Sequence, residues 1–268
     1  MDPFSQPHYY LIELQYLGFR YHGWAKQPNL KTVQGMVNKT LRFVLGDIPF
    51  KTLGSSRTDA MVSANATVFE LFLQAPLDSP NFLETFNKNL PQDIRALSIT
   101  ETDANFNIIQ SVKLKEYLYL FTFGQKIHPF TAPFMTSIQN ELNLELMKEG
   151  AKLFEGEHNF EQYCYKPKPG NNYVRTILTS EIIENDVLLA NFFPDRSYLL
   201  RIKGEGFMHH QIRLMMGALI LLGRGSVSLD DIDKSLQGSK MFEQNVAHAS
   251  GLVLNKLDWS NTKENGQN

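Results

Sequence analysis

Apolar positions in the first hundred residues repeat with the periods of short strands and helices. Residues 8–16 are rich in aromatic and branched side chains and predict a β-strand. After Thr32, a suitable N-cap, apolar residues recur at helical spacing over 33–44 and predict about three turns of helix. Further predicted elements are a strand at 66–73, a helix that begins at Ser79-Pro80 and ends at Pro91, and a strand at 94–101.

The second half of the chain shows a similar mixture. Residues 115–123 alternate tightly and predict a strand, and residues 144–154 place their apolar side chains on one helical face. Residues 207–222 predict the most apolar helix, with Gly223 as its C-cap. The remaining predicted elements are strands at 173–183, 198–203 and 252–257 and a short helix at 228–236 with a capping box of Ser228 and Asp231.

The order of these elements favours an α+β fold. Strands and helices alternate as in a split βαβ or ferredoxin-like unit, once in each half of the chain. We therefore predict two ferredoxin-like halves, each an antiparallel sheet flanked by helices, at residues 1–110 and 111–268. A cleft between the two halves is the default position for a functional site.

Composition narrows the class of protein. The chain has 268 residues, with 19 Phe and 10 Tyr, so it can bury a sizeable core and is not a disordered polymer. Its single cysteine, Cys164, excludes a disulfide scaffold and a cysteine-rich zinc site. The N-terminal residues lack the pattern of a secretory signal, and no apolar run reaches the length of a membrane span. We expect a cytoplasmic protein with no membrane partner.

Charge is unevenly distributed along the chain. The net charge of −2 excludes a polybasic protein, but residues 20–60 carry seven Lys and Arg against two Asp, a local charge of +5. Residues 166–176 carry three cationic side chains and no acid, whereas residues 139–161 carry a net charge of −4. Solvated surface charge explains any single lysine. A basic face opposite an acidic one is also what a polyanion-binding protein of nearly zero net charge requires.

The segment 54–60, Gly-Ser-Ser-Arg-Thr-Asp-Ala, is a loop of small residues that carries a carboxylate. Arg57 lies two residues before Asp59, and we expect it to lower the pKa of Asp59 and keep this carboxylate ionised as a nucleophile. For an isolated Arg-x-Asp, an Asx turn with a surface ion pair is the ordinary interpretation.

Several further motifs share the chain with this loop. They are Y-x-G-x-x-Y-x-G-W-x-x-Q at 16–27, T-V-Q at 32–34, R-T-D-A at 57–60, N-L-P-Q-D-I at 89–94, K-E-Y-x-Y at 115–119, F-E-G-E-H-N-F at 154–160, G-F-M-H-H-Q-I-R at 206–213 and A-S-G-L at 249–252. In this order and spacing, over roughly residues 9–259, the chain closely resembles the tRNA pseudouridine synthase A family.

The resemblance implies isomerisation of uridine to pseudouridine in the tRNA anticodon stem-loop, at the family's usual positions 38 to 40. It implies that Asp59 is the nucleophile, that Tyr117 packs on the base, and that Arg213 is the ionic partner of Asp59. The reaction involves neither net hydrolysis nor redox chemistry, so we expect no cofactor and no metal. The family is usually homodimeric, and tRNA is the expected partner.

A larger set of residues is expected to bind the substrate. It comprises Tyr117, Arg57, His210, Arg20, Lys26, Lys166, Lys168 and Arg175. Each has an ordinary alternative: Tyr117 also suits a cross-strand aromatic pair, and His210 also suits the start of a helix. Adjacent helical residues face about 100° apart, so His209 and His210 would not chelate a metal as an i, i+4 pair does.

The chain departs from the family pattern at several positions near the predicted site. The residues concerned are Ser56, Met61, Ser63, Ile109 and Leu118, where the family usually has glycine, histidine or arginine. Two other functions therefore stay open beside an active synthase. One is a catalytically silent RNA-binding protein of the same fold. The other is a nucleoside hydrolase, which the sequence disfavours because it lacks the acidic cluster of such enzymes.

Overall fold

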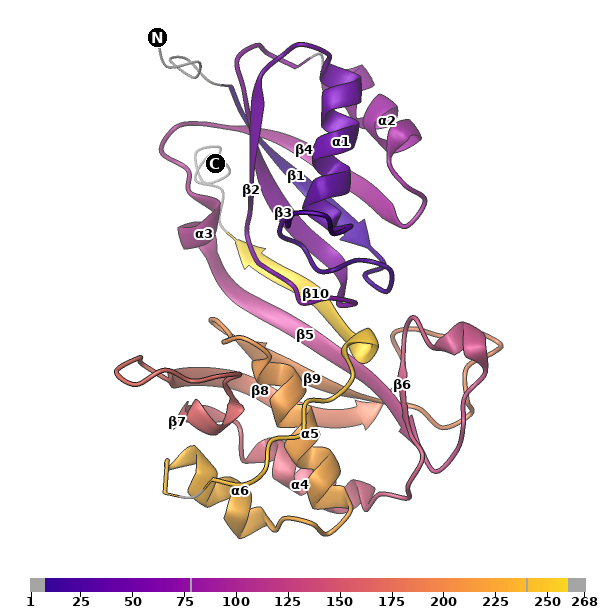
Figure 1. The fold of residues 1–268 in the computed structure, drawn as a ribbon, viewed down its shortest axis with the longest axis vertical. Helices are drawn as coiled ribbons and strands as arrows, with labels where there is room; N and C mark the ends of the chain where they lie inside the picture. Colours follow the sequence, from indigo (N-terminus) through magenta and orange to yellow (C-terminus); the bar gives the residue numbers. More distant parts are fainter. Residues whose placement is uncertain (1–7, 78, 240, 260–268) are drawn as a thin grey trace, which may run out of the picture. The chain divides into compact units, whose positions relative to one another are not determined.

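The computed structural model describes residues 8–77, 79–239 and 241–259, which form two compact units (Figure 1). Unit 1 extends to Lys113 and resumes at Leu254, and unit 2 is Leu114–Val253. The described residues form ten strands and six α-helices, so the predicted α+β class is confirmed. Within the described ranges, no helix is long and apolar enough to cross a membrane.

Unit 1 is built on an antiparallel sheet. Its elements are β1 (His8–Tyr16), α1 (Val33–Leu45), β2 (Phe50–Gly54), β3 (Ser63–Leu73), α2 (Ser79–Asn89), β4 (Ile94–Thr102), α3 (Ile108–Ser111) and most of β10 (Leu252–Trp259). The sheet order is β4-β1-β3, and β2 and β10 both pair with β3. The sequence predicted neither β2 nor α3. With β2 included, the order β-α-β-β-α-β is the ferredoxin-like arrangement.

Both faces of β1 are covered, which explains why its sequence has few polar positions. Leu11 belongs to a buried cluster with Val68 of β3 and Ile108 of α3, and Trp259 packs against this cluster. Its neighbours Tyr10 and Ile12 point to the opposite face, because successive side chains of a strand alternate. Figure 1 shows α1 and α2 together on one side of the β1–β4 sheet.

Unit 2 has an antiparallel sheet of its own. Its elements are β5 (Val112–Phe123), β6 (Thr136–Ile138), α4 (Leu144–Lys152), β7 (Gly156–Asn159), β8 (Val174–Glu184), β9 (Tyr198–Gly204), α5 (Gln211–Gly223) and α6 (Leu229–Leu236). The order is β5-β9-β8-β7, and β6 pairs in parallel with β5. The sequence did not predict β6 or β7, which are three and four residues long and lack a clear alternation.

Alternate residues of β5 serve different faces of this sheet. Leu118 and Leu120 pack against Met135 and Leu199, beneath the loop that joins β8 to β9. Tyr117 and Tyr119 therefore point to the other face, and the hydroxyl of Tyr119 donates to the carbonyl of His248 at 2.7 Å. Figure 1 shows α4, α5 and α6 grouped beside the sheet.

The predicted helix at 207–222 begins and ends later than expected. It starts at Gln211 because His210 has a φ of 60°, which no helical residue adopts. Gly223 is the last helical residue and not the C-cap, a position taken by Arg224. The left-handed residue that ends the helix is Gly225, with a φ of 74°.

The division into units differs from the predicted boundary after residue 110. Unit 1 continues to Lys113, and residues 254–259 rejoin it, although the prediction assigned them to the second half. The physical reason is that β10 pairs with β3, and the Asn65 amide donates to Asn255 Oδ1 at 2.8 Å. The predicted cleft between the two halves stays a prediction.

Candidate functional site

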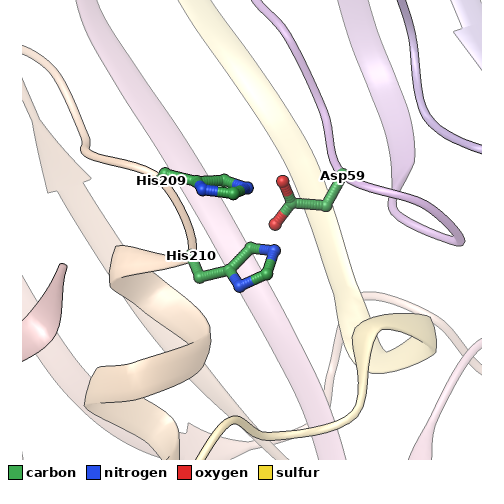
Figure 2. Close-up of side chains that lie close together, drawn as sticks. All are labelled: Asp59, His209 and His210. Carbon is green, nitrogen blue, oxygen red and sulfur yellow. The ribbon is translucent and has the colours of Figure 1, made fainter. Parts of the chain in front are cut away.

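Asp59 lies in the loop at residues 55–62, between β2 and β3 of unit 1, and Figure 2 labels it. The side chain is half-buried. The predicted loop is confirmed. The predicted strand after it, β3, begins three residues earlier than expected, at Ser63.

The segment 16–24 holds this loop mainly through backbone hydrogen bonds. The N–H of Trp24 donates to the Thr58 carbonyl at 3.2 Å, and the N–H of Met61 donates to the Tyr21 carbonyl at 2.9 Å. The hydroxyls of Tyr16 and Thr58 lie 2.9 Å apart in a further hydrogen bond. Bonds therefore fall on both sides of Asp59 and restrict where its carboxylate can lie.

Two glycines permit this close approach. A Cβ on Gly18 would lie 2.0 Å from the Val62 carbonyl oxygen, and one on Gly23 would lie 2.5 Å from the Thr58 carbonyl oxygen. Gly23 also has a φ of 84°, in the region that favours glycine. The G-x-x-Y-x-G spacing of the motif is thus required by packing against the Asp59 loop.

Met61 occupies a backbone conformation that suits glycine better. Its φ is 67°, which costs a residue with a Cβ about 1–2 kcal/mol. This is the position where the resembled family has glycine, so the substitution places strain two residues from Asp59. Ser63, another departure, accepts a hydrogen bond from the N–H of Gly18 at 2.9 Å.

The T-V-Q motif links the loop to α1. Thr32 is the N-cap of α1 and accepts from the N–H of Gly35, as predicted. The Gln34 amide accepts from the N–H of Lys26 at 3.0 Å and donates to Thr52 of β2. The glutamine therefore ties the segment after Trp24 to the strand that leads into the Asp59 loop.

Arg20, predicted to bind substrate, pairs with Asp93 of the N-L-P-Q-D-I motif. Its Nε donates to Asp93 Oδ2 and its Nη2 donates to Oδ1 at 2.8 Å. Tyr21 also donates to Asp93 Oδ1, at 2.6 Å. Burial acts to raise the pKa of Asp93, but the hydrogen bonds from Arg20 and Tyr21 outweigh it and hold the pKa below its usual range. Arg20 thus helps to fix the loop that supports Asp59.

Tyr117 lies in β5 of unit 2, opposite Ile202 of β9. It is 7% exposed, and its ring meets that of Phe207 edge to face at 5.2 Å. Phe207 belongs to the G-F-M-H-H-Q-I-R motif, so two of the motifs meet at this contact. The packing restricts the orientation of the Tyr117 ring.

Arg213 lies in the first turn of α5. Its Nε donates to the Ala247 carbonyl at 2.8 Å, and the N–H of Ala247 donates to the Arg213 carbonyl at 3.1 Å. Arg213 also lowers the pKa of Tyr119, although burial dominates and raises that pKa well above its usual range. The guanidinium is therefore held beside β5 and the segment before β10.

The other predicted substrate-binding residues lie on loops and strand ends. Lys26 and Arg57 are exposed in unit 1, and Lys166 and Lys168 are exposed in the loop before β8. Arg175 is half-buried, and its Nη1 donates to the carbonyls of Asn172 and Val174. In unit 2 the structure brings His210 and Lys166 next to the ring of Tyr165, a residue that the sequence did not predict.

His209 and His210 precede α5 as adjacent residues, as Figure 2 shows, with ring centroids 4.0 Å apart. His210 stands at the N-cap position without a side-chain capping bond. Its position at the start of the helix fits the structural alternative that the sequence left open. Within either unit taken separately, the described residues bring no three His, Cys, Asp or Glu side chains close enough to share a metal ion.

Comparisons with known proteins agree with the motifs. A family profile described as tRNA pseudouridine synthase matches residues 151–260. A protein named tRNA pseudouridine synthase A 2, from Bacillus cereus, is 30% identical over 254 residues, which is 94% of this chain and 100% of that protein. A protein named tRNA pseudouridine synthase A, from Clostridium botulinum, is 29% identical over 91% of this chain and 96% of its own.

Similarity to solved structures is weaker. A chain in the crystal structure of a Cbf5-Nop10-Gar1 complex superposes with a TM-score of 0.34 and 16% identity. The match covers 79% of this chain and only 44% of that chain. It adds no argument about the site.

Proposed function

The chain belongs to the tRNA pseudouridine synthase family, whose reaction is the isomerisation of uridine in tRNA, and on this premise we propose that Asp59 is the catalytic nucleophile. The half-buried position of Asp59, in a loop held by backbone hydrogen bonds on both sides, supports the proposal. A reacting group that is already oriented lowers the barrier to reaction, because less freedom is lost in the transition state. The fixed position of the Asp59 loop is therefore the observation on which the proposal rests.

The proposed reaction needs one carboxylate and no net change of atoms. Asp59 attacks C1′ of the target uridine, and the N1–C1′ bond breaks with its electrons moving to the uracil. The uracil turns in place, and C5 forms a bond to C1′ as the carboxylate leaves. The proton on C5 is then lost, and N1, which carried no proton in uridine, takes one up. Reactant and product are isomers.

We propose that Tyr117 packs on the target base and that Arg213 is the counter-charge of the Asp59 carboxylate. The T-shaped contact with Phe207 holds the Tyr117 ring in one orientation, which suits packing on a uracil. The assignment of Arg213 as the counter-charge of Asp59 rests on the family resemblance. Its bond to Ala247 supports only a fixed guanidinium.

We propose the anticodon stem-loop, at positions 38 to 40, as the target, with the uridine turned out of its stack. Lys26, Arg57, Lys166 and Lys168 are exposed cations that suit phosphate contacts. Arg20 is bound by Asp93, so we give it the supporting role described above. We further propose that the enzyme is a cytoplasmic homodimer, which light scattering of the purified protein tests for its oligomeric state.

Tritium release from tRNA labelled with [5-³H]uridine tests the activity, because the C5 proton enters water in each turnover. We expect Asp59→Asn to lower the rate by about 10³-fold or more while tRNA binding persists. Asp47→Asn, an exposed aspartate after α1, is the matched control and retains the wild-type rate. Residual activity within tenfold of wild type in Asp59→Asn contradicts the nucleophile.

Mapping the modified positions separates the parts of the proposal. Pseudouridine outside positions 38 to 40 contradicts the target but leaves the activity intact. A wild-type protein that binds tRNA and releases no tritium favours the silent RNA-binding alternative.

For Tyr117, we expect the Phe variant to keep its affinity for tRNA and to turn over more slowly, and the Ala variant to lose affinity as well. Equal kinetics in the two variants contradict a role for the ring.

A further inference from the structure

A second aromatic cluster lies in unit 2, and one of its two segments follows Phe207, the residue whose ring contacts Tyr117. It consists of Tyr165 and Lys166 from the loop after the 3₁₀ turn η2 (Glu161–Tyr163), and of His209 and His210 from the turn before α5. The N–H of Tyr165 donates to the His209 carbonyl at 3.1 Å and joins the two segments. We call these four residues the Tyr165 cluster.

The three rings of the cluster contact one another in tilted and edge-to-face arrangements. The Tyr165 ring lies 4.8 Å from that of His210 at 42°, and 5.3 Å from that of His209 nearly at right angles. The centroids of the two imidazoles lie 4.0 Å apart, and Figure 2 shows the two rings close together. Three aromatic rings with such short separations form a rigid surface, because each restricts the rotamers of the others.

Exposure argues against a purely structural role for this surface. A cluster that served packing alone would be expected to bury its rings. Instead, His209 and Lys166 are exposed and Tyr165 is only half-buried. The Lys166 ammonium lies 5.3 Å from the centre of the Tyr165 ring, which places a cation beside the aromatic surface.

Backbone geometry at the cluster is unusual in two places. Lys166 has a φ of 51° and His210 has a φ of 60°, both in the left-handed region that favours glycine. Such a backbone conformation is strained for a residue with a Cβ and persists where the surroundings require it. Two of the four positive-φ non-glycine residues of the described chain therefore lie in one cluster of four residues.

The charge of the two segments that form the cluster, the loop after η2 and the turn before α5, indicates which kind of ligand it binds. Residues 165–176 and 206–213 contain no Asp or Glu, while Lys166, Lys168 and Arg175 are cationic. Aromatic rings beside cations suit a nucleobase attached to a phosphate backbone. Phe207, two residues before His209, contacts Tyr117, so one short segment carries both a residue of the cluster and a contact of the proposed base-binding tyrosine.

We propose that Tyr165 stacks on an unpaired nucleobase next to the target uridine, that His209, whose ring is nearly perpendicular to that of Tyr165, contacts the edge of this base, and that Lys166 contacts its phosphate. This assignment rests on the proposed function, since it takes tRNA as the ligand. His210 supports the Tyr165 ring from the side of α5. The cluster then holds the RNA strand that flanks the flipped uridine, as a positioning subsite.

The first test uses the kinetics of tritium release. We expect Tyr165→Leu and His209→Ala each to raise KM by about tenfold, with kcat changed much less, because a lost contact with the base weakens substrate binding. Tyr165→Phe keeps the ring and is expected to restore most of the affinity. Phe130→Leu is the matched control: Phe130 is 68% exposed and contacts His128, at 4.9 Å, in another aromatic–histidine pair of unit 2. We expect its KM to equal that of the wild type.

The second test identifies the stacked base without requiring turnover. Binding is measured for a series of anticodon stem-loop RNAs, each with one abasic nucleotide next to the target uridine. At the stacked position, the abasic RNA binds the wild type more weakly, and the difference between wild type and Tyr165→Leu disappears. A difference that stays constant for every RNA overturns the stacking assignment.

Lys166→Gln tests the phosphate contact, because this substitution removes the cation and leaves the three rings in place. We expect the slope of log affinity against log salt to fall in magnitude by about one. An unchanged slope overturns this part of the proposal.

If the wild type releases no tritium, the proposed function fails while the binding tests still report on the cluster. If the wild type is active and Tyr165→Leu has wild-type KM and binding, the subsite alone fails.

Discussion

The Asp59 loop of unit 1 and the turn before α5 of unit 2 both carry motif residues, but different interactions hold them. Backbone hydrogen bonds and two glycines fix the Asp59 loop against the segment 16–24. Side-chain rings and a left-handed His210 fix the turn before α5. The Asp59 loop thus requires glycines, which have no side chain to obstruct the close approach, whereas the turn before α5 requires the contacts of its aromatic side chains.

This difference explains which departures from the family pattern the chain tolerates. In the Asp59 loop, Ser56, Met61 and Ser63 replace family residues while the backbone bonds to Tyr21 and Trp24 remain. In unit 2, each ring of the Tyr165 cluster contacts the others, so a substitution there removes an interaction that no backbone group replaces. Substitutions should therefore act mainly on stability in unit 1 and on RNA affinity in the Tyr165 cluster.

The largest expected effect on stability comes from adding one carbon to the Asp59 loop. Gly18→Ala places a Cβ 2.0 Å from the Val62 carbonyl oxygen, and the backbone must move to accommodate it. We expect a loss of about 3 kcal/mol in the free energy of unfolding, measured by chemical denaturation. Gly206→Ala, where no atom lies within 4 Å of the added carbon, is the control. A loss below about 1 kcal/mol for Gly18→Ala shows that the loop has room.

A double-mutant cycle tests whether the two regions share an ion pair. If Arg213 is the counter-charge of Asp59, as the resemblance implies, each single replacement by an uncharged residue leaves an unpaired ion. We expect the effects of Asp59→Asn and Arg213→Gln on unfolding free energy to be non-additive by about 1–3 kcal/mol. Additive effects instead assign Arg213 to its bond with Ala247 or to RNA.

Relief of backbone strain should distinguish the two regions directly. Met61→Gly removes the side chain from a left-handed residue, and we expect it to stabilise the protein by about 1 kcal/mol. His210→Gly gives the same relief but loses contacts with two rings, so no gain is expected. Thermal unfolding compares the two variants. A stabilisation by His210→Gly would mean that its ring contacts contribute little.

The smallest expected effect concerns the ion pair behind the Asp59 loop. Because the pKa of Asp93 is lowered in the folded protein, its contribution is present above the unfolded value of about 3.9 and is lost as the pH falls through the folded value. Since Arg20 is half exposed, we expect Asp93→Asn to cost at most about 1 kcal/mol at pH 7. The cost should shrink at acid pH, in unfolding measured across that range. A cost independent of pH would point to lost hydrogen-bond geometry instead of charge.

Elements with a strong local pattern were predictable from the sequence. Thr32 caps α1 and Ser228 with Asp231 forms the capping box of α6, because these bonds join residues three apart in the chain. Short elements were not predictable. β2 and β7 contain five and four residues and no fully buried position, so their pairing partners decide their conformation.

The candidate site divides in the same way. The motifs mark Asp59, Tyr117 and Arg213 in the sequence, and their catalytic roles stay predictions. Nothing in the local pattern marked Tyr165 or joined it to His209, because the contact between them joins residues 44 positions apart and arises only when the loop after η2 meets the turn before α5. His210 was predicted to be helical because its apolar neighbours favour a helix. Its left-handed backbone belongs to a turn that packs against the distant loop after η2, and the local pattern does not show this packing.

Local order was thus encoded in the amino-acid sequence: the α+β class, the longer strands and helices, the N-caps of α1 and α6, and the motif loop that carries Asp59. Tertiary structure alone decided that β10 returns to β3, that Gly18 and Gly23 face carbonyl oxygens, and that three rings meet at Tyr165. The physical reason is the range of the interactions. Caps and periodic faces depend on residues within one or two turns, whereas strand pairing, steric limits and ring contacts depend on partners distant in the chain.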